Sequence, residues 1–208
     1  MDQAPTRPRR IGVLGGTFDP IHMGHLVAAS EALHALDLDQ VVFVPAGRPW
    51  QKSSYTDGED RFMMVSLAVS AHPRFSASRV ELDRRGPTYT VDTLQELRDF
   101  WGEDVALFFI TGADSASGIR TWHDPDRLGR VAEVVAVARG GTDAVAFEGN
   151  EDLPRVNVLA MPRIDVSGTE VRRRVREGSP IDFLVPPEVV AYIREHGLYS
   201  GSEVAFDA

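Results

Sequence analysis

A buried strand and the helix after it are predicted by residues 11–25, which read Ile11-Gly12-Val13-Leu14-Gly15-Gly16-Thr17-Phe18-Asp19-Pro20-Ile21-His22-Met23-Gly24-His25. The apolar run 11–14 is typical of a strand, and residues 26–36 show helical periodicity. Strand, glycine turn and helix in this order form a setting in which backbone N–H groups bind phosphate. His22 and His25 are three residues apart, so both imidazoles should lie on one side of the first helical turn. The segment therefore predicts a nucleotide-phosphate site.

Composition predicts one globular domain. The 208 residues are 43% hydrophobic and 25% charged, with no cysteine, which excludes a disulfide framework and a thiolate metal site or nucleophile. The net charge of -9 argues against nucleic acid as the main partner, although local basic groups can still bind small anions. No run reaches the ~18 apolar residues of a membrane span, and no secretory signal follows the N-terminus. We therefore expect a cytoplasmic protein without a membrane partner, whose oligomeric state the sequence leaves open as a possible homo-oligomer.

Apolar runs alternate with helical patterns along the chain. The strands expected are 11–14, 41–44, 75–82, 105–110, 131–138 and 155–161, and the helices expected are 26–36, 60–71, 91–100, a pair within 115–128, 169–177 and 187–196. This alternation predicts an α/β fold: a Rossmann-like, doubly wound, mostly parallel sheet with helices on both faces. Residues 1–10 are expected to be a disordered arm, 11–199 a single domain, and 200–208 a tail.

The motifs that are absent after the first strand limit which kind of nucleotide site the first turn can be. Neither the dinucleotide-binding G-x-G-x-x-G pattern nor the P-loop pattern G-x-x-x-x-G-K-[ST] is present there. The sequence has H-x-G-H instead, in which Gly24 leaves room for phosphate and His22 and His25 offer N–H donors. A zinc site lacks a third ligand at a suitable spacing. The structural alternative is that both histidines cap or pack the helix start.

Seven motifs, in order along the chain, resemble the bacterial nicotinate mononucleotide adenylyltransferases of the H-x-G-H nucleotidylyltransferase superfamily. They are GGTFDPIHMGH (15–25), VPAGRPWQK (44–52), GPTYTVDTL (86–94), TGADSASGIRTW (111–122), VAVARGG (135–141), DVSGTEVRRRV (165–175) and LVPPEVVAYIREHGLY (184–199). The resemblance covers roughly residues 11–199. It implies transfer of AMP from ATP to nicotinate mononucleotide, giving deamido-NAD and pyrophosphate, with Mg²⁺ bound chiefly by phosphates and water.

The resemblance also implies which residues bind ATP. His22 and His25 would be the catalytic pair that stabilises charge at the α-phosphorus. The other ATP contacts expected are Gly15, Gly16, Thr17, Phe18, Gly112, Asp114, Ser167, Thr169 and Arg172. Ser167 and Glu170 also have the S-x-x-E spacing of a capping box, and Asp114 is equally suited to cap the helix after it. Asp19 is interpreted as a turn or cap residue before Pro20 rather than as a catalytic base.

Nicotinate mononucleotide would contact Lys52, Tyr89, Thr90, Trp122 and Arg139. The resemblance places at Thr90 and Trp122 the main-chain N–H groups that hold the nicotinate carboxylate, and an amide would present its own NH₂ to one of these donors. Trp122 is also suited to stack on the pyridine ring, and a core aromatic is its alternative interpretation. Lys52 is also consistent with an ordinary loop lysine.

The chain departs from the family pattern at Gly140 and at Gly168, and four other kinds of protein are alternatives that specific motifs distinguish. The family has Arg-Pro-Gly where this chain has Arg139-Gly140, and I-S-S-T where it has 166–169, so Gly168 lacks a hydroxyl. Phosphopantetheine adenylyltransferases carry threonine in place of His22, cytidylyltransferases carry an R-T-x-G-I-S-T-T-like segment, and class I aminoacyl-tRNA synthetases carry K-M-S-K-S. A nucleotide sensor without catalysis need not keep both His22 and His25.

Overall fold

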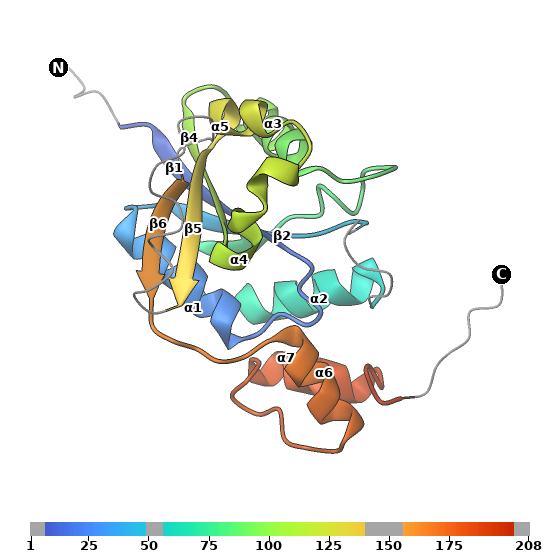
Figure 1. The fold of residues 1–208 in the computed structure, drawn as a ribbon. Coiled ribbons are helices and arrows are strands. Elements are labelled where there is room, and N and C mark those ends of the chain that lie inside the picture. Colours follow the sequence, from blue (N-terminus) through green and yellow to red (C-terminus); the bar gives the residue numbers. More distant parts are fainter. Residues whose placement is uncertain (1–6, 49–55, 140–155, 202–208) are drawn as a thin grey trace.

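A six-stranded parallel sheet forms the centre of the molecule in the computed structural model, which describes residues 7–48, 56–139 and 156–201 (Figure 1). The strand order is β3-β2-β1-β4-β5-β6, and every neighbouring pair is parallel. The strands are β1 (Arg9–Gly16), β2 (Gln40–Pro45), β3 (Phe75–Ala77), β4 (Val105–Gly112), β5 (Glu133–Arg139) and β6 (Val156–Met161). The predicted doubly wound, Rossmann-like architecture is confirmed.

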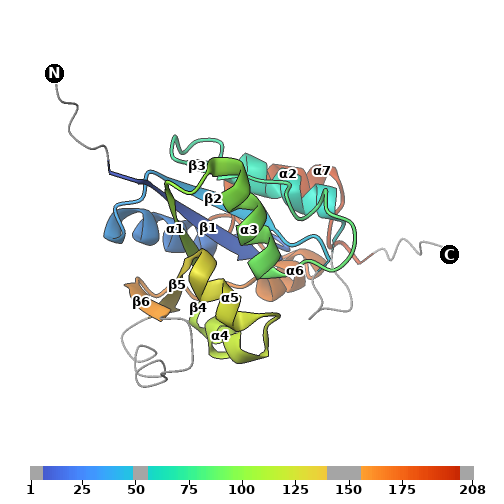
Figure 2. The ribbon, with the colours of Figure 1, turned by 90° about the horizontal axis from the view of Figure 1, so that it is seen from above.

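Helices cover both faces of the sheet (Figures 1 and 2). They are α1 (Met23–Ala35), α2 (Gly58–Val69), α3 (Thr90–Trp101), α4 (Ala113–Ser117), a 3₁₀ turn η1 (Ile119–Thr121), α5 (Pro125–Val131), α6 (Gly168–Arg176) and α7 (Pro187–Glu195). None of the helices in the described part of the chain is long and apolar enough to cross a membrane.

Two hydrophobic clusters, one on each face, hold the layers together. Successive side chains of a strand point to opposite faces, so Phe108 and Ile110 of β4 pack with α1, α2 and α7, whereas Leu107 and Phe109 pack with α3 and α5. Every one of these four side chains is 4% exposed or less. The near-continuous apolar runs seen in the sequence follow from burial on both faces.

The strand order reverses direction beside β1, which has β2 on one side and β4 on the other. Because all three strands are parallel, their carboxyl ends, at Gly16, Pro45 and Gly112, meet at one edge of the sheet. In open α/β sheets, the crevice beyond such an edge is where ligands bind. The fold therefore places the loops after β1, β2 and β4 around one region.

The first and third strands differ in length from the sequence expectation. β1 begins at Arg9, so Arg9 and Arg10 belong to the sheet rather than to a disordered arm, and the Arg10 N–H donates to Asp39 at 2.7 Å. That hydrogen bond is the main reason why the pKa of Asp39 is lowered. β3 ends at Ala77 instead of continuing to residue 82, and beyond it the Asp83 N–H donates to the Arg79 carbonyl at 3.0 Å in a turn.

The C-terminal part of the chain docks against the first loop through Asp19. The Asp19 carboxylate accepts hydrogen bonds from the Tyr199 hydroxyl at 2.7 Å and the Thr56 N–H at 3.4 Å. The Asp19 carbonyl accepts one from Arg172 of α6. Asp19 is only 6% exposed, so these donors replace the water that its carboxylate lacks.

The pKa of Tyr199 is raised, first by burial of the hydroxyl and then by the nearby Asp19 charge. The hydroxyl therefore stays protonated, and can donate to Asp19, at every pH below the ordinary tyrosine pKa of ~10. This hydrogen bond is lost only at higher pH.

Replacing Tyr199 with phenylalanine should lower the free energy of unfolding by about 1.5–3 kcal/mol, because a buried carboxylate loses a charge-assisted hydrogen bond. Chemical denaturation at neutral pH measures this change. Tyr192→Phe is the control: its hydroxyl donates to Asp60 at 2.8 Å in a more exposed place between α7 and α2, so we expect a loss of only about 0.5–1 kcal/mol. If both variants lost the same free energy of unfolding, the hydrogen bond to the buried Asp19 would contribute no more than the one to Asp60, and the expectation would be wrong.

Candidate active site

The histidine pair lies at the start of α1, directly beyond the glycine loop. The His22 and His25 rings stack with centroids 3.6 Å apart and planes 19° apart, so both imidazoles do lie on one side of the helix. His22 is the N-cap residue, and its N–H donates to His25 Nδ1 at 3.2 Å. The Phe18 ring meets His25 edge-on at 4.9 Å. The pair therefore shapes the helix start while presenting two imidazoles at the helix N-terminus, so the capping role is compatible with phosphate binding.

A buried arginine that sequence reasoning missed holds the loop in front of these histidines. Arg61 of α2 is fully buried, and its Nη1 donates to the Thr17 carbonyl at 2.8 Å while its Nε donates to the Thr56 carbonyl at 2.9 Å. The available signal is its spacing, because Arg61 shares a helix face with the buried Met64 and Val65. A charge at a core position of a helix predicts a specific buried acceptor.

A cavity of about 520 Å³ opens where β1, β2 and β4 end. Its lining includes residues expected from both halves of the proposed reaction, namely Gly15, Gly16, Thr17 and Asp114 on the ATP side and Tyr89, Thr90 and Trp122 on the mononucleotide side. The remaining described residues of the expected ATP set, which do not line this cavity, are Phe18, His22, His25, Gly112, Ser167, Thr169 and Arg172. The cavity thus joins the glycine loop to the start of α3 and to the segment after β4.

Two aromatic pairs line the cavity. Trp122 packs edge-on against Phe109 of β4, with centroids 5.8 Å apart, and so belongs to the core and to the cavity wall at once. Trp122 therefore packs as a core aromatic, and its stacking on the pyridine ring stays a prediction. Tyr89 stacks on His123 with centroids 4.1 Å apart. His123 was not expected from the sequence, although it follows Trp122 directly.

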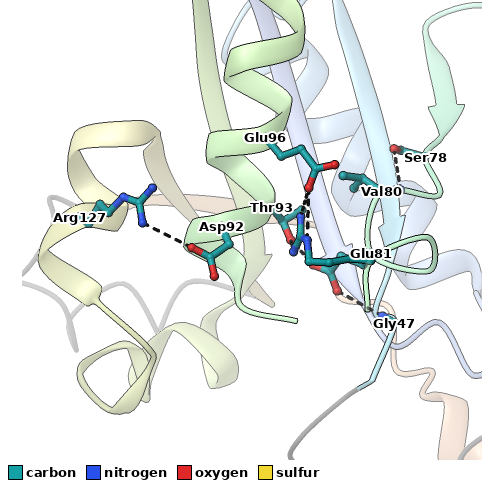
Figure 3. A network of polar contacts seen from close by, with 9 residues as sticks. Gly47, Ser78, Val80, Glu81, Asp92, Thr93, Glu96 and Arg127 are labelled. Atoms are coloured by element: carbon teal, nitrogen blue, oxygen red, sulfur yellow. Dashed lines mark hydrogen bonds and ion pairs between the residues drawn. The ribbon is translucent and has the colours of Figure 1, made fainter. Parts of the chain in front are cut away.

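A chain of polar contacts beside these rings was also missed. Glu81 and Thr93 line the cavity, and the Thr93 hydroxyl donates to Glu81 Oε1 at 2.8 Å (Figure 3). The other carboxylate oxygen, Oε2, accepts from the Gly47 N–H at 3.3 Å. Glu81 lies in the stretch expected to be a strand, where nothing in the local pattern marks a carboxylate as part of a site.

The N-terminus of α6 faces the first loop. Ser167 Oγ accepts from the Glu170 N–H at 3.2 Å, so half of the expected capping box forms. The Glu170 carboxylate instead bonds to Arg173 and Arg174, which lower its pKa to about 2, with Arg173 the larger cause. The guanidinium of Arg172 donates to the Asp19 carbonyl, and through Nη2 to Thr169 Oγ1 at 3.3 Å.

One expected role needs correction, and a second gains a tertiary contact. Asp114 lies inside the first turn of α4, and the N-cap residue is Gly112, so Asp114 does not cap this helix. Asp19 lies in a turn with Pro20, as expected, and its buried carboxylate also joins distant segments by accepting from the Tyr199 hydroxyl and the Thr56 N–H.

Two of the residues expected to contact nicotinate mononucleotide are Lys52 and Arg139. Lys52 lies outside the described residues. Arg139 is the last residue of β5, and its side chain is not described. Among the described residues, no group of three or more His, Asp or Glu is placed to hold a metal ion.

Comparison with known proteins gives a family model and several named relatives. Residues 13–174 match the model of the cytidylyltransferase-like family. A protein of Leifsonia xyli named "Probable nicotinate-nucleotide adenylyltransferase" is 52% identical over 196 residues, which are 93% of this chain and 95% of that protein. A protein of the same name from Saccharopolyspora erythraea is 48% identical over 202 residues, 95% and 93% of the two chains.

Solved structures support the fold. The nicotinic acid mononucleotide adenylyltransferase of Plasmodium falciparum, complexed with NaAD, superposes with a TM-score of 0.72 at 20% identity, covering 92% of this chain and 97% of that one. The same enzyme complexed with APC gives 0.72 at 19% identity, with the same coverage of both chains. Together with the relatives matched over nearly their whole length, these findings show that the chain belongs to the cytidylyltransferase-like family and, within it, to the nicotinate-nucleotide adenylyltransferases, which are nucleotidyltransferase enzymes.

Proposed function

We propose that this protein transfers AMP from ATP to nicotinate mononucleotide, forming deamido-NAD and pyrophosphate in NAD biosynthesis, as a cytoplasmic enzyme that uses Mg²⁺-bound ATP. One observation carries the proposal: the glycine loop after β1 lines the same cavity as the start of α3 and Trp122. A phosphate site and a site suited to an aromatic carboxylate therefore share one space, as a reaction that joins two nucleotides requires. The names of the relatives support the same substrates.

The proposed reaction needs no nucleophile from the protein. A phosphate oxygen of the mononucleotide attacks the α-phosphorus of ATP in line, the new P–O bond forms, and the bond to pyrophosphate breaks. The protein contributes by aligning the two substrates and stabilising charge at the α-phosphorus and the leaving group. Mg²⁺ would supply further charge neutralisation on the phosphate oxygens.

His22 and His25 would be the donors closest to the reacting phosphate. Their stacked rings are held by the hydrogen bond between the His22 N–H and His25 Nδ1, so their orientation is set before substrate binds. Gly16 and Thr17 would add main-chain contacts, and the Thr17 carbonyl is fixed by Arg61. Preorganised donors of this kind stabilise developing charge without reorganisation.

The start of α6 would bind the triphosphate from the opposite side. Ser167 caps the helix, and Thr169 and Arg172 lie in its first turns, where anions are favoured. Arg172 and Gly168 both meet Asp19, which places this helix start beside the loop that leads to His22. Gly112 and Asp114 after β4 would hold the adenylate ribose or base, at the edge where such groups bind.

The mononucleotide would enter the cavity with its ring against Trp122 and Tyr89. Its carboxylate would be held by main-chain N–H groups at Thr90 and Trp122, and its phosphate by Lys52 and Arg139. The intrahelical hydrogen bonds of α3 start with Asp92 and Thr93, whose N–H groups both donate to the Tyr89 carbonyl at 3.1 Å. The N–H of Thr90 precedes that point and so lies in the part of a helix available to an anion.

Purified protein incubated with ATP, Mg²⁺ and nicotinate mononucleotide should release pyrophosphate and form the acid dinucleotide. Nicotinamide mononucleotide should react more slowly, because its NH₂ faces a donor that the carboxylate accepts from. Chromatography of the dinucleotides and a pyrophosphate assay measure both rates. Absence of the acid dinucleotide would refute the proposed activity, and equal rates would refute the proposed selectivity.

His22→Ala should lower kcat for the acid substrate by ~10²-fold, because a donor to the charge that develops in the transition state is lost. Steady-state kinetics together with a melting curve separate this from a folding effect. His34→Ala is the matched control, since His34 is exposed in the last turn of the same helix. If His22→Ala changed only the melting temperature, its role would be limited to capping α1.

Gly168→Ser tests whether restoring the hydroxyl that the family pattern carries improves ATP binding. A Cβ at Gly168 would stand 2.6 Å from the Asp19 carbonyl oxygen, so the helix start would have to move. We expect a loss of about 1–3 kcal/mol in unfolding free energy and a raised KM for ATP. If stability were unchanged and the KM for ATP fell, the close approach of Gly168 to the Asp19 carbonyl would not limit the side chain at position 168.

A further inference from the structure

A directed chain of hydrogen bonds runs from the surface to the cavity wall (Figure 3). Arg84 Nε donates to the exposed Glu96 at 3.2 Å, and Arg84 Nη1 donates to Thr93 Oγ1 at 2.9 Å. Thr93 in turn donates to Glu81 Oε1 at 2.8 Å, and Glu81 Oε2 accepts from the Gly47 N–H at 3.3 Å. The chain ends on a carboxylate that lines the cavity.

The direction of each hydrogen bond follows from the groups present. A guanidinium has only donors, so the Thr93 oxygen must accept from Arg84. The one hydroxyl proton of Thr93 is then available for Glu81, whose ionised carboxylate only accepts. Thr93 is 3% exposed, so water does not compete for this bond. Glu81 is therefore the acceptor on which the orientation of the Thr93 hydroxyl depends.

Glu81 also joins two separate parts of the cavity wall. Gly47 belongs to the loop after β2, and the Glu81 backbone packs so closely against it that a Cβ at Gly47 would stand 2.2 Å from the Glu81 carbonyl oxygen. Thr93 lies on α3, one turn after Thr90. A shift of Glu81 would therefore move the Gly47 loop and the start of α3 relative to each other.

The Glu81 carboxylate places a negative charge at the wall of the cavity. The substrates proposed above are anions, and a carboxylate at the cavity wall repels them. Glu81 is thus unsuited to contact the nicotinate carboxylate. Its donors, Thr93 and the Gly47 N–H, point to a role in holding the cavity wall in place.

We propose that Glu81 is a positioning residue that sets selectivity for the acid over the amide mononucleotide. Through Thr93 it holds the first turn of α3, and with it the Thr90 N–H, in the orientation that accepts a carboxylate. This inference rests on the proposed function and adds to it a residue that does not touch the selected group.

Glu81→Gln tests the proposal with little change in shape. The Gly47 N–H can only donate, whereas the Thr93 hydroxyl can also accept, so we expect the amide oxygen to face Gly47 and Thr93 to lose its acceptor. We expect kcat/KM for nicotinate mononucleotide to fall about 10-fold, mainly through KM, while the value for nicotinamide mononucleotide changes less than about 2-fold. Calorimetric Kd values for both mononucleotides provide the same ratio without turnover.

Glu96→Gln is the matched control, because it alters the same chain at its exposed end and keeps an acceptor for Arg84. It should leave the acid-to-amide ratio unchanged. An unchanged ratio in Glu81→Gln, or an equal loss for both mononucleotides, would overturn the proposal. Wild-type protein that forms neither dinucleotide would refute the proposed function itself, which is a different result.

Substitutions of Thr93 give an independent test that does not alter the charge at the cavity wall. Thr93→Val should lower the ratio as Glu81→Gln does, and Thr93→Ser should keep it, because serine retains the hydroxyl. The double variant Glu81→Gln with Thr93→Val should lose little more than either single variant, since both break one link. Additive losses, or a Thr93→Val variant with the wild-type ratio, would contradict the proposal.

Discussion

The buried carboxylate of Asp19 is the contact on which the arrangement of the candidate site depends. Its partners, Tyr199 and the Thr56 N–H, come from distant parts of the chain, and its carbonyl accepts from Arg172. A carboxylate that is 6% exposed would be costly without these donors. Docking of the C-terminal segment therefore stabilises the conformation of the first loop, and it places the start of α6 beside that loop.

The parallel sheet imposes a second constraint. With β1 between β2 and β4, three strand ends meet at one edge, and the loops that follow them surround the cavity. The segments that bind the two substrates in our proposal therefore lie side by side without a second domain. The chemistry assigned to the cavity is mainly alignment and charge stabilisation, which suits rigid loops at the end of a sheet.

Charged side chains bonded to main-chain groups give these loops their rigidity. Arg61 holds the Thr17 carbonyl, Arg172 the Asp19 carbonyl, and Glu81 the Gly47 N–H. Such charge-assisted hydrogen bonds are stronger than neutral ones, and they fix backbone rather than side-chain positions. A loop held in this way presents N–H groups to a ligand in a defined direction, which is how a residue that never contacts substrate can affect selectivity.

The sequence by itself determined the order of strands and helices, the strand–turn–helix at residues 11–25, the common side of His22 and His25, and the family. The first three features follow from local periodicity and spacing, which report burial and helical geometry within a few residues, whereas the family follows from the resemblance of seven motifs in order along the chain. Tertiary structure alone decided the end of β3 at Ala77, the partners of Asp19, and the cavity-lining place of Glu81. The hydrogen bonds of Asp19 to Tyr199 and of Glu81 to Gly47 span 180 and 34 residues, so no local pattern marks them. The physical reason is that burying a polar group requires a partner, and the packing of the whole chain determines which group that is.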